Sequence, residues 1–382
     1  MTDFQIIVLA TPVFFLLIGI EILVGWKRGR NTYRLNDALN SIGLGVMSQL
    51  VGVFTVLIML GIYTVLYEHA ALWKLPADSV WVWVVGLVAY DFCYYWRHRF
   101  GHTVALFWAA HVVHHQSEDY NLSTALRQTS TGWVGDWIFY LPMALLGFPP
   151  LVFAVVGLID LLYQYWVHTQ QIGKLGWFDR WFCAPSNHRV HHAVNDKYLD
   201  KNYGGILIVW DRMFGSFIDE DDAEPCVYGT RGPLRSWNPL WANLHNYADM
   251  AQDTWRARSW ADKLRVWFMH PGWRPADVAQ RWPKPAFDIA RVERFDPPMS
   301  RGAQGLALAL FLGVLGATTA FLWFAHHLTL VEQIAAALGI FAALWAVGRI
   351  CEHCWAAAPG RPKQGPTLAE GRPPYPGDGL SS

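Results

Sequence analysis

The most regular feature of this chain is a series of long apolar runs separated by shorter polar segments. Three runs lie in the first quarter of the chain, at 5–26, at about 41–67 and at about 79–96. Two more lie near its end, at about 303–325 and 329–350. Each approaches or exceeds the roughly 20 residues that a helix needs to cross the hydrocarbon core of a bilayer. The pattern therefore predicts five membrane helices.

A further apolar stretch between Trp133 and Trp166 is broken by Gly147-Phe-Pro-Pro150. Two consecutive prolines stop a helix, so we predict a hairpin of two membrane helices with its tip at the break. Asp136 and Asp160 lie near the ends of the two halves.

The positions of Lys and Arg predict how these seven spans are oriented. Basic residues cluster at 27–34 and 97–99 and throughout 171–300, whereas the loop at 68–78 carries only Lys74. Cytosolic loops are enriched in Lys and Arg. We therefore predict that the N-terminus is external and that the more hydrophilic region 171–300 is cytosolic.

Composition fits this interpretation and narrows the classes of partner. Of the 382 residues 53% are hydrophobic and only 16% are charged, which is too apolar for an ordinary soluble enzyme. The net charge of zero indicates no nucleic-acid partner, and five scattered cysteines indicate no disulfide framework. The predicted fold class is an all-α integral membrane protein, a multi-span helical bundle with a cytosolic, histidine-rich cap that holds two metal ions.

The predicted organisation has five parts along the chain. They are N-terminal membrane helices (1–78), a core with three histidine boxes (79–218), a cytosolic cap or linker (219–302), a C-terminal membrane helix pair (303–350) and a disordered tail (351–382).

The candidate chemistry lies in nine of the fifteen histidines, all between His98 and His192. Three boxes hold eight of them, and His168 stands alone between the second and third box. The boxes are His98-Arg-Phe-Gly-His102, His111-Val-Val-His114-His115 and His188-Arg-Val-His191-His192.

On a helix, residues three and four apart share one face, so each box directs its imidazoles to one side. Packing alone does not account for three such boxes within one hundred residues. A single catalytic zinc takes about three protein ligands, so nine histidines predict two neighbouring metal ions. Six other histidines are not expected at the site: His69, His245, His270, His326, His327 and His353.

Several polar residues are placed to support these ligands. Asp91 precedes His98 by seven residues and so lies on the same helical face. It either accepts a hydrogen bond from a ligand imidazole, which would fix the tautomer, or forms an ion pair with a neighbouring helix. The further candidates are Asp160 and Gln164, on the face of His168, and Asn195 and Asp200, after the third box.

The membrane setting favours iron over the other metals that imidazole binds. Imidazole suits Zn, Cu, Fe and Ni, so the ligands alone leave the metal open. A site at the mouth of an apolar bundle meets lipid chains, whose carbon is altered only by an oxidant. Two ferrous ions activate dioxygen, whereas zinc permits only hydrolysis.

The three boxes resemble those of the membrane fatty acid hydroxylase and sterol desaturase superfamily, whose members hold a di-iron centre. Residues 85–218 carry the resemblance, and within them the segments 108–128, 163–169 and 188–215 look like the glyceryl-ether (alkylglycerol) monooxygenase branch. The resemblance implies that the eight box histidines bind iron, with His168 as a ninth ligand. It also implies a pocket for the cofactor or the lipid headgroup, whose residues would be Glu118, Asp119, Tyr120, Asn121 and Arg127.

The same five residues are also typical of a hydrogen-bonded helix cap, and both interpretations stay open here. The candidate catalytic residues beside the metal ligands are Asp91, Glu118 and Asn195.

The resemblance implies a reaction and its partners. Dioxygen would hydroxylate the carbon next to the ether oxygen of an alkylglycerol in the bilayer, and the product would separate into a fatty aldehyde and a glycerol derivative. Tetrahydrobiopterin or a separate electron-donor protein would supply the electrons.

The sequence leaves two alternatives to this reaction. One is a lipid hydroxylase or sterol desaturase that uses a separate electron-transfer protein. The other is a metal transporter, which is disfavoured because transport sites lie near the bilayer midplane and these boxes lie at helix ends.

Overall fold

The computed structural model describes residues 3–353, so the predicted tail (351–382) lies outside the described residues from position 354 onward, while Cys351 and Glu352 end a helix. Within the described part, the chain forms helices and loops with two isolated bridges and no strand. The predicted all-α class is confirmed for this part.

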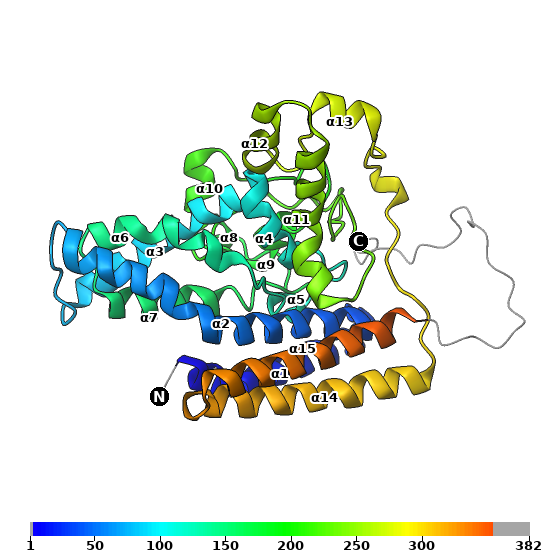
Figure 1. The fold of residues 1–382 in the computed structure, drawn as a ribbon, viewed down its shortest axis with the longest axis horizontal. Helices are drawn as coiled ribbons and strands as arrows, with labels where there is room; N and C mark the ends of the chain where they lie inside the picture. The colour runs from blue at the N-terminus through cyan, green and yellow to red at the C-terminus, as the bar shows by residue number, and fades with distance from the viewer. Residues whose placement is uncertain (1–2, 354–382) are drawn as a thin grey trace, which may run out of the picture.

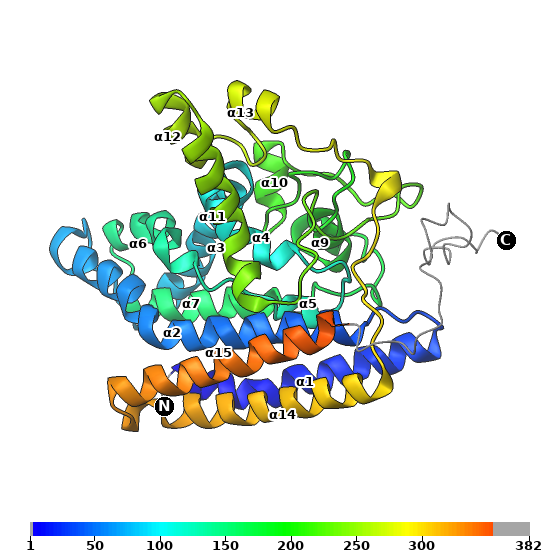
Figure 2. The same ribbon diagram turned by 45° about the vertical axis from the view of Figure 1, so that its right-hand side comes forward.

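Four helices in the described part are long and apolar enough to cross a membrane. They are α1 (Asp3–Lys27), α2 (Leu35–Ala70), α14 (Arg301–Phe324) and α15 (Leu330–Glu352). Figures 1 and 2 show them side by side along one flank of the molecule. Leu50, Phe311 and Leu344 belong to their shared core, while many other apolar side chains on these helices face outward. An outward apolar surface is what a lipid environment requires.

A second layer forms where α3 (Val80–Thr103) packs on α7 (Pro150–Tyr163), which in turn packs on α2. Tyr63 of α2 donates a hydrogen bond to the Phe148 carbonyl at 2.9 Å, and its ring stacks on Phe153 with centroids 4.1 Å apart. These contacts fix α7 on α2, and α7 in turn supports α3, which ends in the first histidine box.

The predicted membrane hairpin between residues 133 and 166 is wrong. This stretch forms η1 (Gly132–Val134), η2 (Asp136–Tyr140), the five-residue α6 (Leu141–Leu145) and α7. At 1.5 Å per residue, the 14 residues of α7 extend about 21 Å, which is shorter than the roughly 30 Å hydrocarbon core.

The predicted count of seven spans is wrong for the same reason and because of α3. Only four helices of the described part have the length and hydropathy of a span, and α3 is not among them. Its last two turns carry Arg97, His98, Arg99 and His102, which contact the cap rather than lipid.

The remaining helices are short and build a cap over one side of the bundle (Figure 2). They are α4 (Ala105–His115), α5 (Leu122–Ala125), α8 (Phe178–Trp181), α9 (Pro185–His191), α10 (Val209–Phe214), α11 (Pro239–Arg256), α12 (Trp260–Phe268), α13 (Ala276–Arg281) and η3 (Ile289–Arg291). The η4 turn (Ala325–His327) belongs to the bundle instead, where it joins α14 to α15.

The cap is tied to the bundle at the start of α2 and the end of α15. Asn40 donates to the Trp237 carbonyl at 2.8 Å, and Glu352 accepts the Trp237 N–H at 2.7 Å. Gly348 allows this approach, because a Cβ there would lie 2.3 Å from the Trp237 carbonyl oxygen.

Candidate metal centre

All nine predicted histidines converge in the structure. The last turns of α3 supply His98 and His102, α4 supplies the second box, and α9 with the residue that follows it, His192, supplies the third. His168 follows α7 and points to the same place. The imidazoles form two groups in which the candidate ligand atoms lie within 4.8 Å of one another: His98, His102, His111, His115 and His191 in the first, and His114, His168, His188 and His192 in the second.

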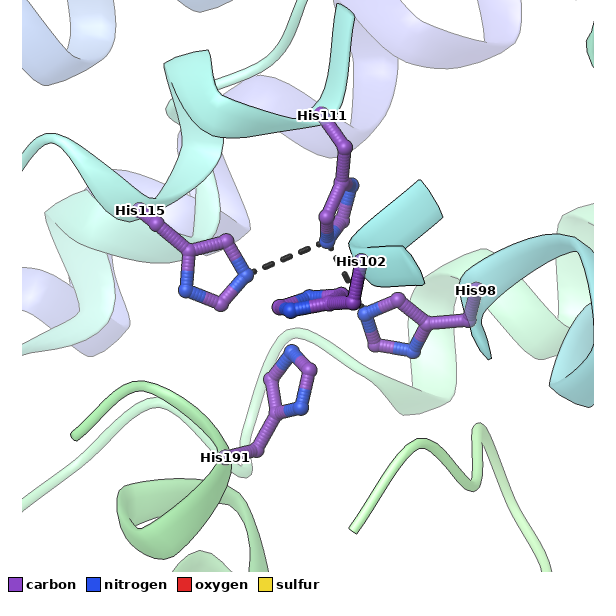
Figure 3. A group of neighbouring side chains, drawn as sticks. All are labelled: His98, His102, His111, His115 and His191. Atoms are coloured by element: carbon purple, nitrogen blue, oxygen red, sulfur yellow. Dashed lines mark hydrogen bonds between the residues drawn. The ribbon is translucent and has the colours of Figure 1, made fainter. Parts of the chain in front are cut away.

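The first group surrounds a common centre, with its rings pointing toward one another (Figure 3). His111 Nε2 lies 3.0 Å from His98 Nε2 and 3.1 Å from His115 Nε2. Two nitrogens bound to one ion at about 2.1 Å lie roughly 3.0–3.4 Å apart. The spacing therefore fits ligands that share an ion.

The second group repeats this spacing. His168 Nε2 lies 3.1 Å from both His114 Nε2 and His188 Nε2, and His192 Nε2 lies 3.2 Å from His188 Nε2. The groups adjoin where the rings of His115 and His192 stack with centroids 4.3 Å apart. Two ions held by these groups would be neighbours.

Backbone carbonyls orient four of the rings. Nδ1 of His98 donates to Tyr203 O at 2.8 Å, and Nδ1 of His114 donates to Arg127 O at 2.9 Å. His168 and His191 are held in the same way by the carbonyls of Gln164 (2.8 Å) and Lys201 (3.0 Å). A carbonyl only accepts, so the proton is on Nδ1 and the Nε2 lone pair is free for a metal.

The burial of the imidazoles also fits a metal. Burial lowers the pKa of His114 to about 4 and lowers the pKa of the other eight as well, so all nine are neutral at pH 7. His102 Nε2 and His191 Nε2 are buried without a hydrogen-bond partner among the described residues. Such atoms are costly unless something binds them, and neutral imidazole is the form that binds metal.

Asp200 connects the first group to the surface of the cap. Its Oδ1 lies 3.6 Å from Nδ1 of His102, and its Oδ2 accepts from Nε2 of the half-exposed His270 at 3.0 Å. Asp200 has a φ of 57°, in the left-handed region that Asp and Asn tolerate best among residues with a side chain. This carboxylate faces a ligand imidazole, as a network partner of the site would.

Asp91 is buried, but its carboxylate contacts no imidazole among the described residues. It accepts from the backbone N–H groups of Ile206 (2.6 Å) and Leu207 (3.1 Å) and from Trp210 Nε1 (2.8 Å). These contacts fasten the segment that carries Tyr203 to α3, so Asp91 acts on the position of His98 through the backbone.

The five residues predicted to line a cofactor or headgroup pocket have contacts within the chain. Glu118 accepts the Phe295 N–H at 2.7 Å, Asp119 pairs with Arg34 at 2.8 Å, and Asn121 accepts from Ser123 N at 3.0 Å as the cap of α5. Tyr120 is buried and donates to the Val167 carbonyl, and the buried Arg127 donates to Val113 O. The first four residues hold the segment between the second box and α5, and Arg127, which follows α5, holds the second box.

Asn195, predicted near the third box, lies beside it but is not in either histidine group. Its side chain accepts from Val227 N at 2.9 Å and donates to Pro225 O at 3.1 Å. It joins the end of the third box to the loop of residues 225–228.

A cavity of about 430 Å³ opens onto the histidines. His111, His114 and His168 line it, so it reaches both groups. Its apolar wall comes from α1, α2, α7 and α14, and its polar wall includes Arg97 and Asp136, which form a close ion pair. The cavity therefore joins the membrane helices to the candidate metal centre.

Sequence reasoning missed this polar wall and the carbonyls that orient the rings. Backbone carbonyls have no residue signature. Arg97 and Asp136 are 39 residues apart, and nothing in the pattern of either segment indicates that they meet.

The part of the chain that contains the nine histidines is also the part that matches a known protein family. Residues 83–216 match the fatty acid hydroxylase family model. Alkylglycerol monooxygenase of Homo sapiens is 43% identical over 267 residues, and that of Danio rerio is 42% identical over the same length. These alignments cover 70% of this chain and 59% of each relative, so the matched part spans less than two thirds of those proteins.

Alkylglycerol monooxygenase of Xenopus tropicalis is 39% identical over 307 residues, which cover 80% of this chain and 68% of that protein. No solved structure matches the chain. With its fatty acid hydroxylase domain and this extent of identity, the chain belongs to the alkylglycerol monooxygenase family.

Proposed function

We propose that this protein is a membrane di-iron monooxygenase that hydroxylates the carbon next to the ether oxygen of alkylglycerols. One observation supports this most strongly. Nine buried or partly buried imidazoles form two adjoining groups, and three of these imidazoles line a cavity whose other wall consists of membrane helices.

The cavity fits a lipid chain better than a soluble substrate. Phe14, Val46 and Leu322 contribute to its wall from α1, α2 and α14. A chain lying there would exchange a hydrocarbon environment for another apolar one, so its entry needs no desolvation of charge. The same wall would keep water away from the reacting carbon.

The identity of the metal follows from the chemistry that such a substrate needs. An alkyl C–H bond is not hydrolysed, and two iron ions bound by the imidazole groups would supply dioxygen activation. The first group offers five nitrogens and the second offers four, which suits six-coordinate iron with positions left for dioxygen.

The proposed reaction is balanced as a monooxygenation. One oxygen atom of dioxygen enters the C–H bond, and the other leaves as water with two electrons and two protons from a reductant. The resulting hemiacetal breaks its bond to the ether oxygen, which gives a fatty aldehyde and a free glycerol hydroxyl. Tetrahydrobiopterin is the proposed reductant, and an electron-donor protein is the alternative.

We also propose that the centre faces the cytosol. The starts of α2 and α14 and the ends of α1 and α15 share one end of the bundle, as Figure 2 shows for the latter three. Arg34, at this end, bonds to Asp119 beside the second box. Basic residues 27–34 belong to the same end, and such residues favour the cytosolic side.

The test is product analysis with purified, iron-loaded protein given 1-O-hexadecylglycerol, dioxygen and reduced tetrahydrobiopterin. We expect hexadecanal, with one atom from ¹⁸O₂ in the aldehyde before exchange with water, and no product under anaerobic conditions. Formation of an intact hydroxylated lipid instead of an aldehyde would contradict the ether assignment.

A further inference from the structure

The cap helix α11 exposes an apolar stripe that the proposed reaction does not use. Residues that share one face of this helix are exposed along its whole length: Leu240, Trp241, Leu244, Ala248, Ala251 and Trp255. On the opposite face Ala242, Asn243 and Asp253 are buried. Trp255 is 86% exposed, so the described part of the chain leaves this end of the stripe uncovered.

The next helix, α12, packs on α11 and adds a second stripe. Trp260, Leu264 and Phe268 lie one helical turn apart, and all three are exposed, Trp260 by 81%. Val266 on the other face is buried. We call the exposed residues of these two stripes the α11–α12 apolar band.

The band begins at the level where two membrane helices end. Asn40, in the second turn of α2, donates to the Trp237 carbonyl, and Glu352, the last residue of α15, accepts the Trp237 N–H. The first residue of α11, Pro239, follows Trp237 by two positions. The start of α11 therefore lies where the chain leaves the apolar part of the bundle.

The direction of α11 also matters. Figures 1 and 2 both show it running away from the bundle and across the direction of the membrane helices. Its 18 residues extend about 27 Å. Membrane helices cross the bilayer, so an amphipathic helix that runs across them at their ends lies along the bilayer surface.

The charges around the band are complementary to anionic lipid headgroups. Seven basic and four acidic residues lie between positions 239 and 284. The four aspartates are each paired with one of the basic residues, which are Arg265, Arg274, Arg281 and Lys284. Arg256, Arg258 and Lys263 form no ion pair with any residue that the structure describes, and they lie next to Trp255 and Leu264 in the sequence or close to them. An excess of positive charge beside an apolar helix face attracts a surface that carries anionic lipids.

We infer that the α11–α12 apolar band is a membrane-binding surface, which rests in the headgroup region of the leaflet on the side of the cap and binds anionic lipids there. The apolar side chains would enter roughly 5–10 Å into the boundary between headgroups and acyl chains, where tryptophan is enriched. A soluble partner or a second copy would need this face to be open to water at the ends of the membrane helices, where headgroups already lie. The inference goes beyond the proposed reaction and does not depend on it.

The test uses the iron-loaded full chain in vesicles of phosphatidylcholine and phosphatidylserine, with Cys354→Ser as the background because the four described cysteines are buried. An NBD fluorophore is attached at Leu264→Cys. We expect its fluorescence to be quenched by lipids that carry a nitroxide near the headgroup, and not by iodide present on both sides of the vesicle. The matched control is Arg291→Cys on η3, whose side chain is 86% exposed and lies outside the band. It should be quenched by iodide and not by the lipids.

Two results would overturn the inference. Equal quenching by iodide at Leu264→Cys and Arg291→Cys would mean that the band faces water. Protection of Leu264→Cys from both quenchers would mean that protein covers it, either a partner or a second copy. If Leu264→Cys fails to retain iron, Leu244→Cys on α11 carries the same test with the same outcomes.

The choice of anionic lipids has its own readout. At equal mole fraction, nitroxide-labelled phosphatidylserine should quench Leu264→Cys about twofold or more above labelled phosphatidylcholine, because unpaired cations enrich anionic lipid near them. Adding Arg258→Gln and Lys263→Gln should reduce this ratio. Equal quenching by the two lipids, or a ratio that these substitutions leave unchanged, would overturn the assignment of anionic lipids. Neither measurement involves turnover, so failure of the proposed reaction would leave both results standing.

Discussion

At the scale of single residues, the imidazoles are distinguished less by their number than by how each is held. Backbone carbonyls fix Nδ1 of four rings, and Asp200 faces Nδ1 of a fifth, His102. Burial keeps all nine rings neutral. The free-energy cost of burying these polar groups is therefore met when the chain folds, before a metal binds, as is typical of a preformed site.

His168 belongs to no box, yet its Nε2 lies as close to the second group as any box ligand. We expect His168→Ala to lower the iron content from about two to about one per chain, because it removes one of four ligands from that group. Iron is measured by elemental analysis of the purified protein. His245→Ala is the control, since His245 is partly buried and hydrogen-bonded to Ala242 O but lies in neither group. An equal iron content in the two variants would exclude His168 as a ligand.

Asp200 faces Nδ1 of the His102 ring. Asp200→Asn keeps the residue in a conformation that Asn also tolerates, but it removes the negative charge beside the ligand ring. We expect the affinity for the more weakly held ion to fall about tenfold, with little change in thermal stability of the metal-free protein. Titration with an iron chelator measures this. An unchanged affinity would show that Asp200 is only a surface partner of His270.

At the scale of elements, α2 positions the site as well as crossing the membrane. Gly45 of α2 packs against the segment that follows the second box, where a Cβ would lie 2.2 Å from Leu126 O. The nearby Arg127 carbonyl is the one that orients His114. Close approach of α2 therefore transmits the packing of the bundle to the second group.

We expect Gly45→Ala to destabilise the protein by about 1–3 kcal/mol, because backbone atoms must move apart. Gly61→Ala on the same helix is the control, since a Cβ at Gly61 would meet nothing within 4 Å. There the substitution should be neutral or slightly stabilising, as alanine favours the helix. Thermal unfolding in detergent compares the two. Equal melting temperatures would show that α2 does not set this contact.

The sequence predicted some of these elements and not others for physical reasons. Helical spacing is a local property of the sequence. The three boxes and the face shared by Gln164 and His168 could therefore be predicted from it. How the boxes divide between two ions was not, because His114 turns to a different group from its neighbours His111 and His115. That division depends on where α9 and the residues after α7 lie in space.

The prediction of a membrane hairpin failed for a similar reason. Apolar composition between residues 133 and 166 is equally suited to lipid and to a protein core. Gly147 has a φ of 86°, and a Cβ there would lie 1.9 Å from Trp73 O, so the break is a tight turn packed against the loop that follows α2. The apolar residues on either side, such as Met143 and Val152, are buried against α2 and α3 rather than exposed to lipid.

At the scale of the whole molecule, the bundle and the cap act as one unit. The Trp237 contacts with Asn40 and Glu352 join them at the end where basic residues 27–34 lie. The cavity is thus lined both by helices of the bundle and by histidines of the candidate metal centre.

The orientation can be measured with a membrane-impermeant maleimide in intact cells. The four cysteines in the described part are buried, so Cys354 alone is replaced by serine in the background. We expect Asp78→Cys, in the loop after α2, to be labelled in intact cells. Arg258→Cys in the cap should be labelled only after permeabilisation. The reverse pattern would place the metal centre on the external side.

The most direct test of the central claim is to measure iron and aldehyde production on the same preparations of wild-type protein loaded to different extents. We expect activity to rise with iron and to reach its plateau at about two ions per chain, one for each histidine group. Full activity at one ion per chain or fewer would contradict a centre of two ions.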